Sequence, residues 1–291
     1  MSLSILTNTS AMQTSIGLNK SSTAVAQSMQ RLSSGLRINS AADDAAGYAI
    51  SQGLTAQVNG LEKASQNVSD ATSMVQTAES ALNNVQGMLQ RVSELAVQYQ
   101  NGDLSSQDKT DIQSEVNQLT SEIDRQKGAV QFNGISLLDG TGGASSNGAV
   151  TFQVGPGATD TLTVTFQNIE GTSGNGLGVS GSGFTWSNAS GGGQVFDLSQ
   201  TNAVSLIQGA INNISTMAAT LGAVQNRLQY TANAIATTQE NMSSSLSNIQ
   251  DVNMATEMTK MTQQQVLQQA GTAMLAQANS QPQLVLKLIT G

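Results

Sequence analysis

Apolar residues recur every seven positions over a long stretch of the first half of this chain, and this repeat restricts the folds it can adopt. The first series consists of Leu54, Leu61, Val68, Val75, Leu82, Leu89 and Ala96. A second series, three residues later in each repeat, consists of Ala64, Ala71, Ala78, Val85 and Val92. Alternating steps of three and four keep one apolar stripe of a helix facing a partner helix, as in a coiled coil. Over this length the pattern favours an extended coiled-coil rod over an ordinary helical bundle.

The second half of the chain carries the same repeat. Its main series consists of Ile207, Ile214, Leu221, Leu228, Ile235, Met242 and Ile249. Its interleaved series becomes more polar toward the end and consists of Val204, Ile211, Ala218, Gln225, Ala232, Gln239 and Leu246. A third helix is indicated by Ile112, Val116, Leu119 and Ile123. We expect the two long rods to be antiparallel, because the chain leaves one and enters the other through a single intervening segment.

The segment between the rods has the composition of β structure, since all five phenylalanines and the single tryptophan of the chain lie in it. Apolar and polar residues alternate at 150–154 and 162–166, with a Gly-Pro-Gly sequence between them, which predicts a hairpin. Asn133-Gly134 predicts an earlier tight turn. The Gly- and Ser-rich stretch 171–193 predicts a surface loop. The expected fold is therefore mainly α with a small β region: long antiparallel coiled-coil rods, a β-hairpin and a short glycine-rich outer segment.

The two ends of the chain differ from the rods. Residues 1–42 contain three basic residues and no acid, and residues 253–291 carry only Glu257, Lys260 and Lys287 as charges. The apolar stripe of the first segment is interrupted by the small residues Ser21, Ser28 and Gly35. Helices this weakly amphipathic bury too little surface to be stable alone. We expect other copies of the chain to complete their apolar faces.

Composition excludes several classes of chemistry. The 291 residues include no histidine and no cysteine, so imidazole bases, thiol nucleophiles and most zinc or haem sites are impossible. A net charge of −8 does not provide the basic surface that nucleic-acid binding needs. The apolar run 284–286 is too short to cross a bilayer, and no cleaved signal peptide is evident. A G-x-G-x-x-G string at 176–181 lacks the strand-to-helix context of a dinucleotide site. We predict no catalytic, cofactor or metal site, no nucleic-acid partner and no membrane insertion.

A pair of aspartates follows a break in the first helix and could indicate acid–base chemistry. Ser40 precedes Asp43 by three residues, which is the spacing of a capping box, and an apolar helical pattern follows. The carboxylates would then complement the positive end of the helix dipole. No base or nucleophile is evident nearby. We therefore interpret Asp43 and Asp44 as part of a joint and interface, in which Arg31 and Arg37 pair with acids on a neighbour.

A polar face is predicted near the end of the first rod. Gln90 falls outside both apolar series, and Arg91, Glu94 and Gln98 lie on or near the outer side of the same helix. The simplest interpretation is the solvated surface of a coiled coil. The functional alternative is an interface with adjacent subunits or with a receptor.

Several stretches in combination resemble the terminal regions of bacterial flagellins. They are SMQRLSSGLRINSAADDAAGYAIS at 28–51, LQRVSELAVQ at 89–98, EIDRQKGAVQFNGISLLDG at 122–140, LGAVQNRL at 221–228 and QQQVLQQAGTAMLAQANSQPQLVLKLI at 263–289. The resemblance covers residues 1–170 and 200–291. The remaining stretch falls where flagellins vary most, and its shortness implies that large outer domains are missing.

The resemblance implies a structural subunit that polymerises into the bacterial flagellar filament for swimming motility. Such a subunit is secreted through the flagellar type III apparatus and assembles outside the cell. The implied partners are other copies of the chain, an export chaperone, and the cap and hook-junction proteins. The implied segments are an N-terminal core helix that pairs with the C-terminus (1–42), N-terminal rod helices with the hairpin (43–170), a variable surface segment (171–200), a C-terminal rod helix (201–252) and a C-terminal core helix (253–291).

The same resemblance implies a second recognition surface. Arg91, Leu95 and, on the neighbouring helix, Glu115 match positions that a vertebrate innate immune receptor recognises in flagellins of this type. Ser93 stands where relatives commonly carry a charge, so the strength of that recognition is open.

Two alternative functions are retained from the sequence. A hook–filament junction protein shares the terminal helices, although the motifs at 89–98 and 131–140 favour a flagellin. A surface adhesin could use Phe184 and Trp186 to stack on sugars, whereas packing inside a small β cap is the simpler role for both rings.

Overall fold

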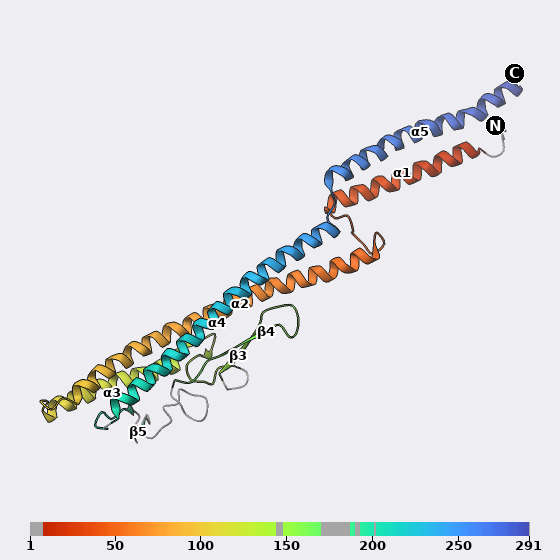
Figure 1. Ribbon diagram of the computed structural model, residues 1–291. Helices are drawn as coiled ribbons and strands as arrows, with labels where there is room; N and C mark the ends of the chain where they lie inside the picture. Colours follow the sequence, from red (N-terminus) through yellow and green to blue (C-terminus); the bar gives the residue numbers. More distant parts are fainter. Residues whose placement is uncertain (1–7, 144–147, 170–186, 190–192, 201, 291) are drawn as a thin grey trace. The chain divides into compact units, whose positions relative to one another are not determined.

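The computed structural model describes residues 8–143, 148–169, 187–189, 193–200 and 202–290. This part of the chain forms five helices and three two-stranded antiparallel sheets (Figure 1). The helices are α1 (Thr9–Ser34), α2 (Ala45–Tyr99), α3 (Ser106–Ala129), α4 (Ala203–Gln250) and α5 (Met254–Thr290). The strands are β1 (Gln131–Phe132), β2 (Ile135–Ser136), β3 (Ala149–Gln153), β4 (Thr161–Thr165), β5 (Ser187–Ala189) and β6 (Gly193–Val195). The expected mainly α fold is confirmed.

Contacts divide the chain into two compact units, which we call the terminal unit and the central unit. The terminal unit consists of Met1–Val58 and Glu240–Gly291, and the central unit consists of Asn59–Gln239. The terminal unit therefore contains α1, α5 and the adjoining ends of α2 and α4. The central unit contains the rest of α2 and α4 together with α3 and all six strands.

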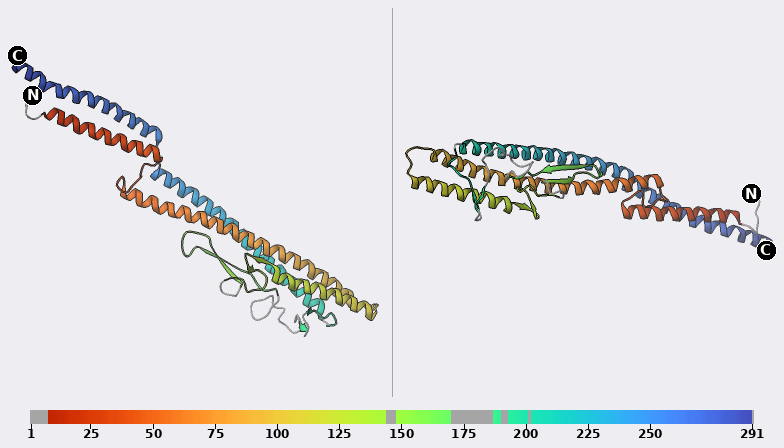
Figure 2. Two further views of the ribbon diagram at one scale, coloured as in Figure 1. Left: turned by 180° about the vertical axis from the view of Figure 1, so that it is seen from behind. Right: turned by 90° about the horizontal axis from the view of Figure 1, so that it is seen from below.

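In the central unit α2 and α4 pack antiparallel along the predicted apolar series, and Figure 2 shows them side by side in both views. Gln225 Nε2 donates to Glu79 Oε2 at 2.7 Å, and Gln86 Nε2 donates to Ser215 Oγ at 3.4 Å, so residue numbers rise in opposite directions. Both α2 series are buried from Leu61 onward. Each such leucine or valine stabilises the fold by about 1.5–3 kcal/mol relative to its exposed state.

The interleaved series of α4 was predicted one residue too late. The main series is buried from Ile207 to Ile235, as predicted. The second set of buried residues is Ala203, Ala210, Met217 and Val224, whereas Val204, Ile211, Ala218 and Gln225 are half-buried. The cause is a second neighbour of α4: Met217 and Leu221 also face Leu137 and Phe166 of the β region. Because α4 packs against the β region as well as α2, its second set of buried residues lies one position earlier than a single partner helix would predict.

Helix α3 folds back beside α2 after a short turn. Its start carries a capping box, in which Asp108 N–H donates to Ser105 Oγ and Ser105 N–H donates to Asp108 Oδ2. Hydrogen bonding to Ser105 keeps the pKa of Asp108 below its ordinary value. Of the four residues predicted to form its apolar face, Leu119 is only half-buried. The cluster between α2, α3 and the start of α4 consists of Val92, Leu95, Ala96, Ile112, Val116, Phe196, Leu198, Ala203 and Ile207.

Two predicted turns are confirmed in the β region. Asn133 and Gly134 connect β1 to β2 with φ angles of 50° and 78°, the positive values that a type I′ hairpin turn requires. Strands β3 and β4 pair from Ala149↔Thr165 to Gln153↔Thr161, and β4 turns Leu162 and Val164 inward. The predicted loop 171–193 lies mostly outside the described residues, although β5 and β6 pair antiparallel across part of it.

In the terminal unit α1 and α5 run antiparallel, and Figures 1 and 2 show them side by side. Asn8 Nδ2, at the start of α1, donates to Ala278 O near the end of α5 at 2.8 Å. At the opposite end of the pair, Ser28 Oγ donates to Glu257 Oε1. The helix pair therefore has a defined register.

Candidate functional site

The helix pair α1–α5 leaves most of its apolar side chains uncovered. Helix α1 buries only Ser28, and Glu257 is the only buried residue among the α5 side chains described, which extend to Gln281. The exposed large apolar residues of the pair are Met12, Ile16, Met29, Met254, Met258, Val266, Leu267 and Met274. Three of them, Met258, Val266 and Leu267, line a shallow groove on α5. Exposed apolar surface of this extent marks an interaction site.

A buried carboxylate lies between the two helices. Glu257 is 4% exposed, and its Oε1 accepts a 2.7 Å hydrogen bond from Ser28 Oγ. Arg31 Nη1 lies 3.9 Å from Oε1, and Lys260 Nζ lies 3.6 Å from Oε2. These partners offset the loss of hydration of the buried charge. Arg31 was predicted to pair with an acid on a neighbour, but it pairs here with an acid of its own chain.

Two features of the sequence, taken together, indicate a polar contact at Glu257. Glu257 is the single acid of residues 253–291, and Ser28 occupies a stripe position where an apolar residue is expected. A polar residue within an apolar stripe sets the register of a helix pair when it meets a polar partner on the other helix. Only the antiparallel pairing of the chain ends brings the two residues together.

The joint between α1 and α2 is held to the end of α4. Gly35, with a φ of 74°, ends α1, and Val252 N–H donates to Gly35 O at 3.0 Å. Arg37 was also predicted to meet an acid. Its Nη2 instead donates to Ile249 O at 2.6 Å, and its backbone N–H donates to Gln250 O at 2.6 Å. The guanidinium thus satisfies carbonyl groups at the negative end of the α4 dipole.

The N-cap of α2 is Asp44, and the predicted capping role of Ser40 is wrong. Asp44 Oδ1 accepts hydrogen bonds from the N–H groups of Ala46 and Gly47 at 3.1 and 3.0 Å. The Asp44 carbonyl accepts the first bond of the helix, from Tyr48 N–H. Two unpaired N–H groups of the first turn are thereby satisfied.

Asp43 closes the turn that precedes the helix. Its Oδ2 accepts hydrogen bonds from the N–H groups of Asn39 and Ser40 and from the Ser40 hydroxyl, at 3.1–3.2 Å. The two backbone N–H groups, Asn39 first, hold the pKa of Asp43 below its ordinary value. Both aspartate side chains therefore accept hydrogen bonds within the joint.

A charged cluster occupies the exposed side of α2 and α3. Arg91 Nε and Nη2 lie 2.9 and 2.8 Å from Glu115 Oε1, and Arg91 Nη1 lies 3.2 Å from Glu94 Oε2. These hydrogen bonds, the one to Glu115 first, raise the pKa of Arg91 further. Gln90 is exposed beside them. The structure thus brings four of the predicted surface residues onto one face.

Leu95 is not part of that face, and its assignment as a surface contact is wrong. Its side chain is 2% exposed and belongs to the cluster with Val92, Ile112 and Val116. Leu95 precedes the seam residue Ala96, and α3 covers it. A heptad pattern identifies the side of α2 that faces one partner helix, but it does not reveal a second partner.

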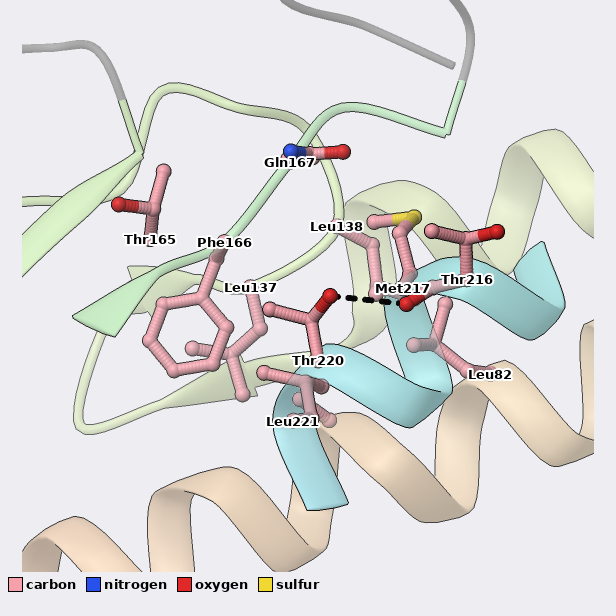
Figure 3. A pocket seen from close by; sticks show the side chains of 11 residues that line it. Leu82, Leu137, Leu138, Thr165, Phe166, Gln167, Thr216, Met217, Thr220 and Leu221 are labelled. Carbon is pink, nitrogen blue, oxygen red and sulfur yellow. Dashed lines mark hydrogen bonds between the residues drawn. The ribbon is translucent and has the colours of Figure 1, made fainter. Parts of the chain in front are cut away.

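The central unit encloses a small cavity between α2, α4 and the β region (Figure 3). Its volume is about 50 Å³, and Leu82, Leu138, Phe166 and Met217 are among its lining residues. Ligand pockets have volumes of roughly 300–1,000 Å³. None of the described lining residues titrates, and the hydroxyl of Thr220 donates to the Thr216 carbonyl at 2.9 Å. We interpret the cavity as a packing void.

Some residues singled out in the sequence lie in parts of the chain that the structure does not describe. Phe184, Trp186 and the glycine string 176–181 lie outside the described residues. Among the described residues, no group of three or more carboxylates could hold a metal ion. No helix in the described part of the chain is apolar over the length needed to span a membrane.

The chain is similar to known proteins over nearly its whole length. The bacterial flagellin N-terminal helical region matches residues 5–142, and the bacterial flagellin C-terminal helical region matches residues 204–289. A flagellin of Bacillus subtilis is 41% identical over 303 aligned positions, covering 97% of this chain and 98% of the relative. A flagellar filament 33 kDa core protein of Treponema phagedenis is 40% identical, with the same coverage of both chains.

The fold is also similar to that of a solved structure. A protein described as flagellar hook-associated, from Vibrio parahaemolyticus, superposes with a TM-score of 0.54 and 15% identity, covering 72% of this chain and all of that one. At this identity the similarity concerns the fold alone. The family matches at both ends and the full-length relatives carry the assignment: the chain belongs to the bacterial flagellin family and is a structural subunit of the flagellar filament.

Proposed function

We propose that α1 and α5 form the main contact between neighbouring subunits of the filament. The supporting observation is the uncovered apolar surface of two helices, 26 and 37 residues long, that bury almost none of their own described side chains. Helices of this kind gain most of their stability from packing on a partner. In a homopolymer that partner is another copy of the chain. The core segments that the family resemblance implies, 1–42 and 253–291, contain these two helices.

Replacing Ile16 with Ser tests this contact. Ile16 is 56% exposed on α1, so the change leaves the melting temperature of the soluble monomer unchanged. Loss of its burial against another subunit costs about 1.5–3 kcal/mol, which lowers the equilibrium constant for subunit addition roughly 10- to 160-fold. Elongation from filament seeds, followed by light scattering over a range of monomer concentrations, measures this.

The matched control is Gln27→Ser, an exposed polar position on the same helix. It removes a side chain of similar length without removing apolar surface, so elongation should continue at the wild-type rate. If the Ile16→Ser variant elongates filaments at the wild-type rate, this region of α1 is not a subunit contact.

We also propose that the charged cluster of Arg91, Glu94 and Glu115, with Gln90 beside it, is a recognition surface. What supports the proposal is its position: a fixed guanidinium–carboxylate arrangement on an exposed face, next to a well-packed core. Planar charged groups of this kind recognise partners by paired hydrogen bonds. The partner is an adjacent subunit or the vertebrate innate immune receptor that the family resemblance implies.

Arg91→Ala should leave folding intact and weaken recognition. Exposed ion pairs contribute only about 0–1 kcal/mol, so the melting temperature should change little. A desolvated arginine contact costs about 2 kcal/mol or more when removed, which predicts a loss of roughly 30-fold in receptor signalling or filament elongation. Arg125→Ala is the control, since Arg125 is also exposed and paired with an acid, Glu122. If both variants behave like wild type, the cluster is only a solvated surface.

Before assembly the uncovered face of α5 offers a surface to other flagellar proteins. We propose that an export chaperone holds this face in the cell, that the chain is secreted, and that the cap and hook-junction proteins contact the terminal helices outside. Copurification of the chaperone with the full chain, and with a chain that lacks residues 253–291, tests the first step. Equal recovery would refute it. We propose no catalytic role, and hydrolase assays on purified filaments should show no turnover.

A further inference from the structure

The methionines of this chain are distributed unevenly between the two units. Of the 11 methionines, the five that are exposed in the described part of the chain all lie on α1 or α5. They are Met12 (66% exposed), Met29 (57%), Met254 (50%), Met258 (48%) and Met274 (62%). In the central unit Met74 and Met217 are buried, at 2% and 7% exposed, and Met88 is half-buried. The accessible thioethers are therefore concentrated on the surface proposed for subunit contact.

The uncovered surface depends on methionine to an unusual degree. Neither α1 nor α5 contains an aromatic residue, and five of their eight exposed large apolar residues are methionines. Methionine packs adaptably because its side chain is unbranched and polarizable. The same thioether reacts with hydrogen peroxide: its sulfur donates an electron pair to one peroxide oxygen, so that an S–O bond forms and the O–O bond breaks. The leaving hydroxide takes the proton from the transferred oxygen and departs as water, and the product is a sulfoxide.

We propose that these five methionines form an oxidant-sensitive modification site that controls whether an unassembled subunit can join a filament. The proposal rests on the function proposed above for α1 and α5. Oxidation replaces an apolar sulfur with a strongly polar S=O group, which must lose water when another subunit covers it. The oxidised subunit stays folded in its central unit, because Met74 and Met217 are buried in its core and Met88 is half-buried, but it is excluded from assembly. Methionine sulfoxide reductases reverse the change.

Assembly should protect the same residues. Once another copy covers α1 and α5, peroxide reaches their thioethers much more slowly. The site therefore acts on free subunits and spares finished filament.

The experiment compares full-length monomer oxidised before assembly with filament oxidised after it. Hydrogen peroxide is the probe, catalase stops the reaction, and peptide mass spectrometry locates the sulfoxides. We expect sulfoxide at the five positions in monomer, little at Met74 and Met217, and a fall of about tenfold or more in seeded elongation. Treatment with both methionine sulfoxide reductases should restore elongation. The melting temperature of the central unit should stay constant.

A variant in which all five methionines are replaced by Leu (Met12→Leu, Met29→Leu, Met254→Leu, Met258→Leu and Met274→Leu) is the matched control, and it should elongate equally well with and without peroxide. If this variant cannot elongate, reductase rescue of the oxidised wild type decides the question: rescue supports the proposal, and its failure overturns it. The proposal is also overturned if fully oxidised monomer elongates filaments at the same rate as untreated monomer. The rates of sulfoxide formation then test the subunit contact separately. If sulfoxide forms slowly in filament but fast in monomer, other subunits do cover α1 and α5. If the two rates are equal, the proposed contact itself is wrong.

Discussion

Leu228→Ala should lower the free energy of unfolding of the soluble monomer by about 2–5 kcal/mol, and Leu89→Ala should have a similar effect. Leu228 is fully buried in α4 and Leu89 is 3% exposed in α2. Truncation removes buried apolar area and leaves a void that a close-packed seam cannot fill completely. Thermal or urea unfolding followed by circular dichroism measures the loss.

Gln90→Ala is the control for this pair of variants. Gln90 adjoins Leu89 in sequence but is exposed, so its truncation should change the unfolding free energy by less than about 0.5 kcal/mol. Equal losses from Leu89→Ala and Gln90→Ala would show that the seam lies on another side of α2.

Ser28→Ala should destabilise the α1–α5 pair by about 1.5–3 kcal/mol, the usual contribution of a hydrogen bond to a charged group. The substitution removes the donor at 2.7 Å from a carboxylate that is 4% exposed. Arg31 and Lys260 remain, but at 3.9 and 3.6 Å they do not replace a short hydrogen bond. The dissociation temperature of filaments measures the effect, because the terminal unit is most stable there.

A double-mutant cycle with Glu257→Gln separates this hydrogen bond from other effects of the substitutions. The amide keeps the length of the side chain and can still accept from Ser28, but it carries no charge. We expect the cost of Ser28→Ala to be smaller in the Glu257→Gln background. Ser21→Ala, one heptad before Ser28 in the same helix, is the position control. A cost that is the same in both backgrounds would mean that Ser28 and Glu257 are not coupled.

The parts of the fold that local pattern determines were predictable. The α2 series is a strong signal because its small and apolar residues repeat without interruption from Leu61 to Ala96, and all of them are buried. The turn at Asn133-Gly134 was predictable because few residues adopt positive φ at adjacent positions. In both cases neighbouring residues alone carry the information.

Local sequence pattern did not predict the features that depend on contact with a further element of the fold. Leu95 and Met217 are buried by α3 and the β region, partners that a heptad pattern for one helix pair does not include. The cap of α2 depended on which of several adjacent acceptors the chain path brings to the first turn, and Asp44 is the one that reaches it. The contact of Ser28 with Glu257 joins residues more than two hundred positions apart.

Hydrogen exchange on soluble monomer and on filament tests most directly whether other copies of the chain complete α1 and α5. Backbone amides of these two helices should exchange rapidly in the monomer and become strongly protected in the filament, because a weakly amphipathic helix pair opens locally until a partner covers it. Amides along the seam of α2 and α4 in the central unit should be protected in both states. Equal and strong protection of α1 and α5 in monomer and filament would contradict the proposal that subunit contacts stabilise them.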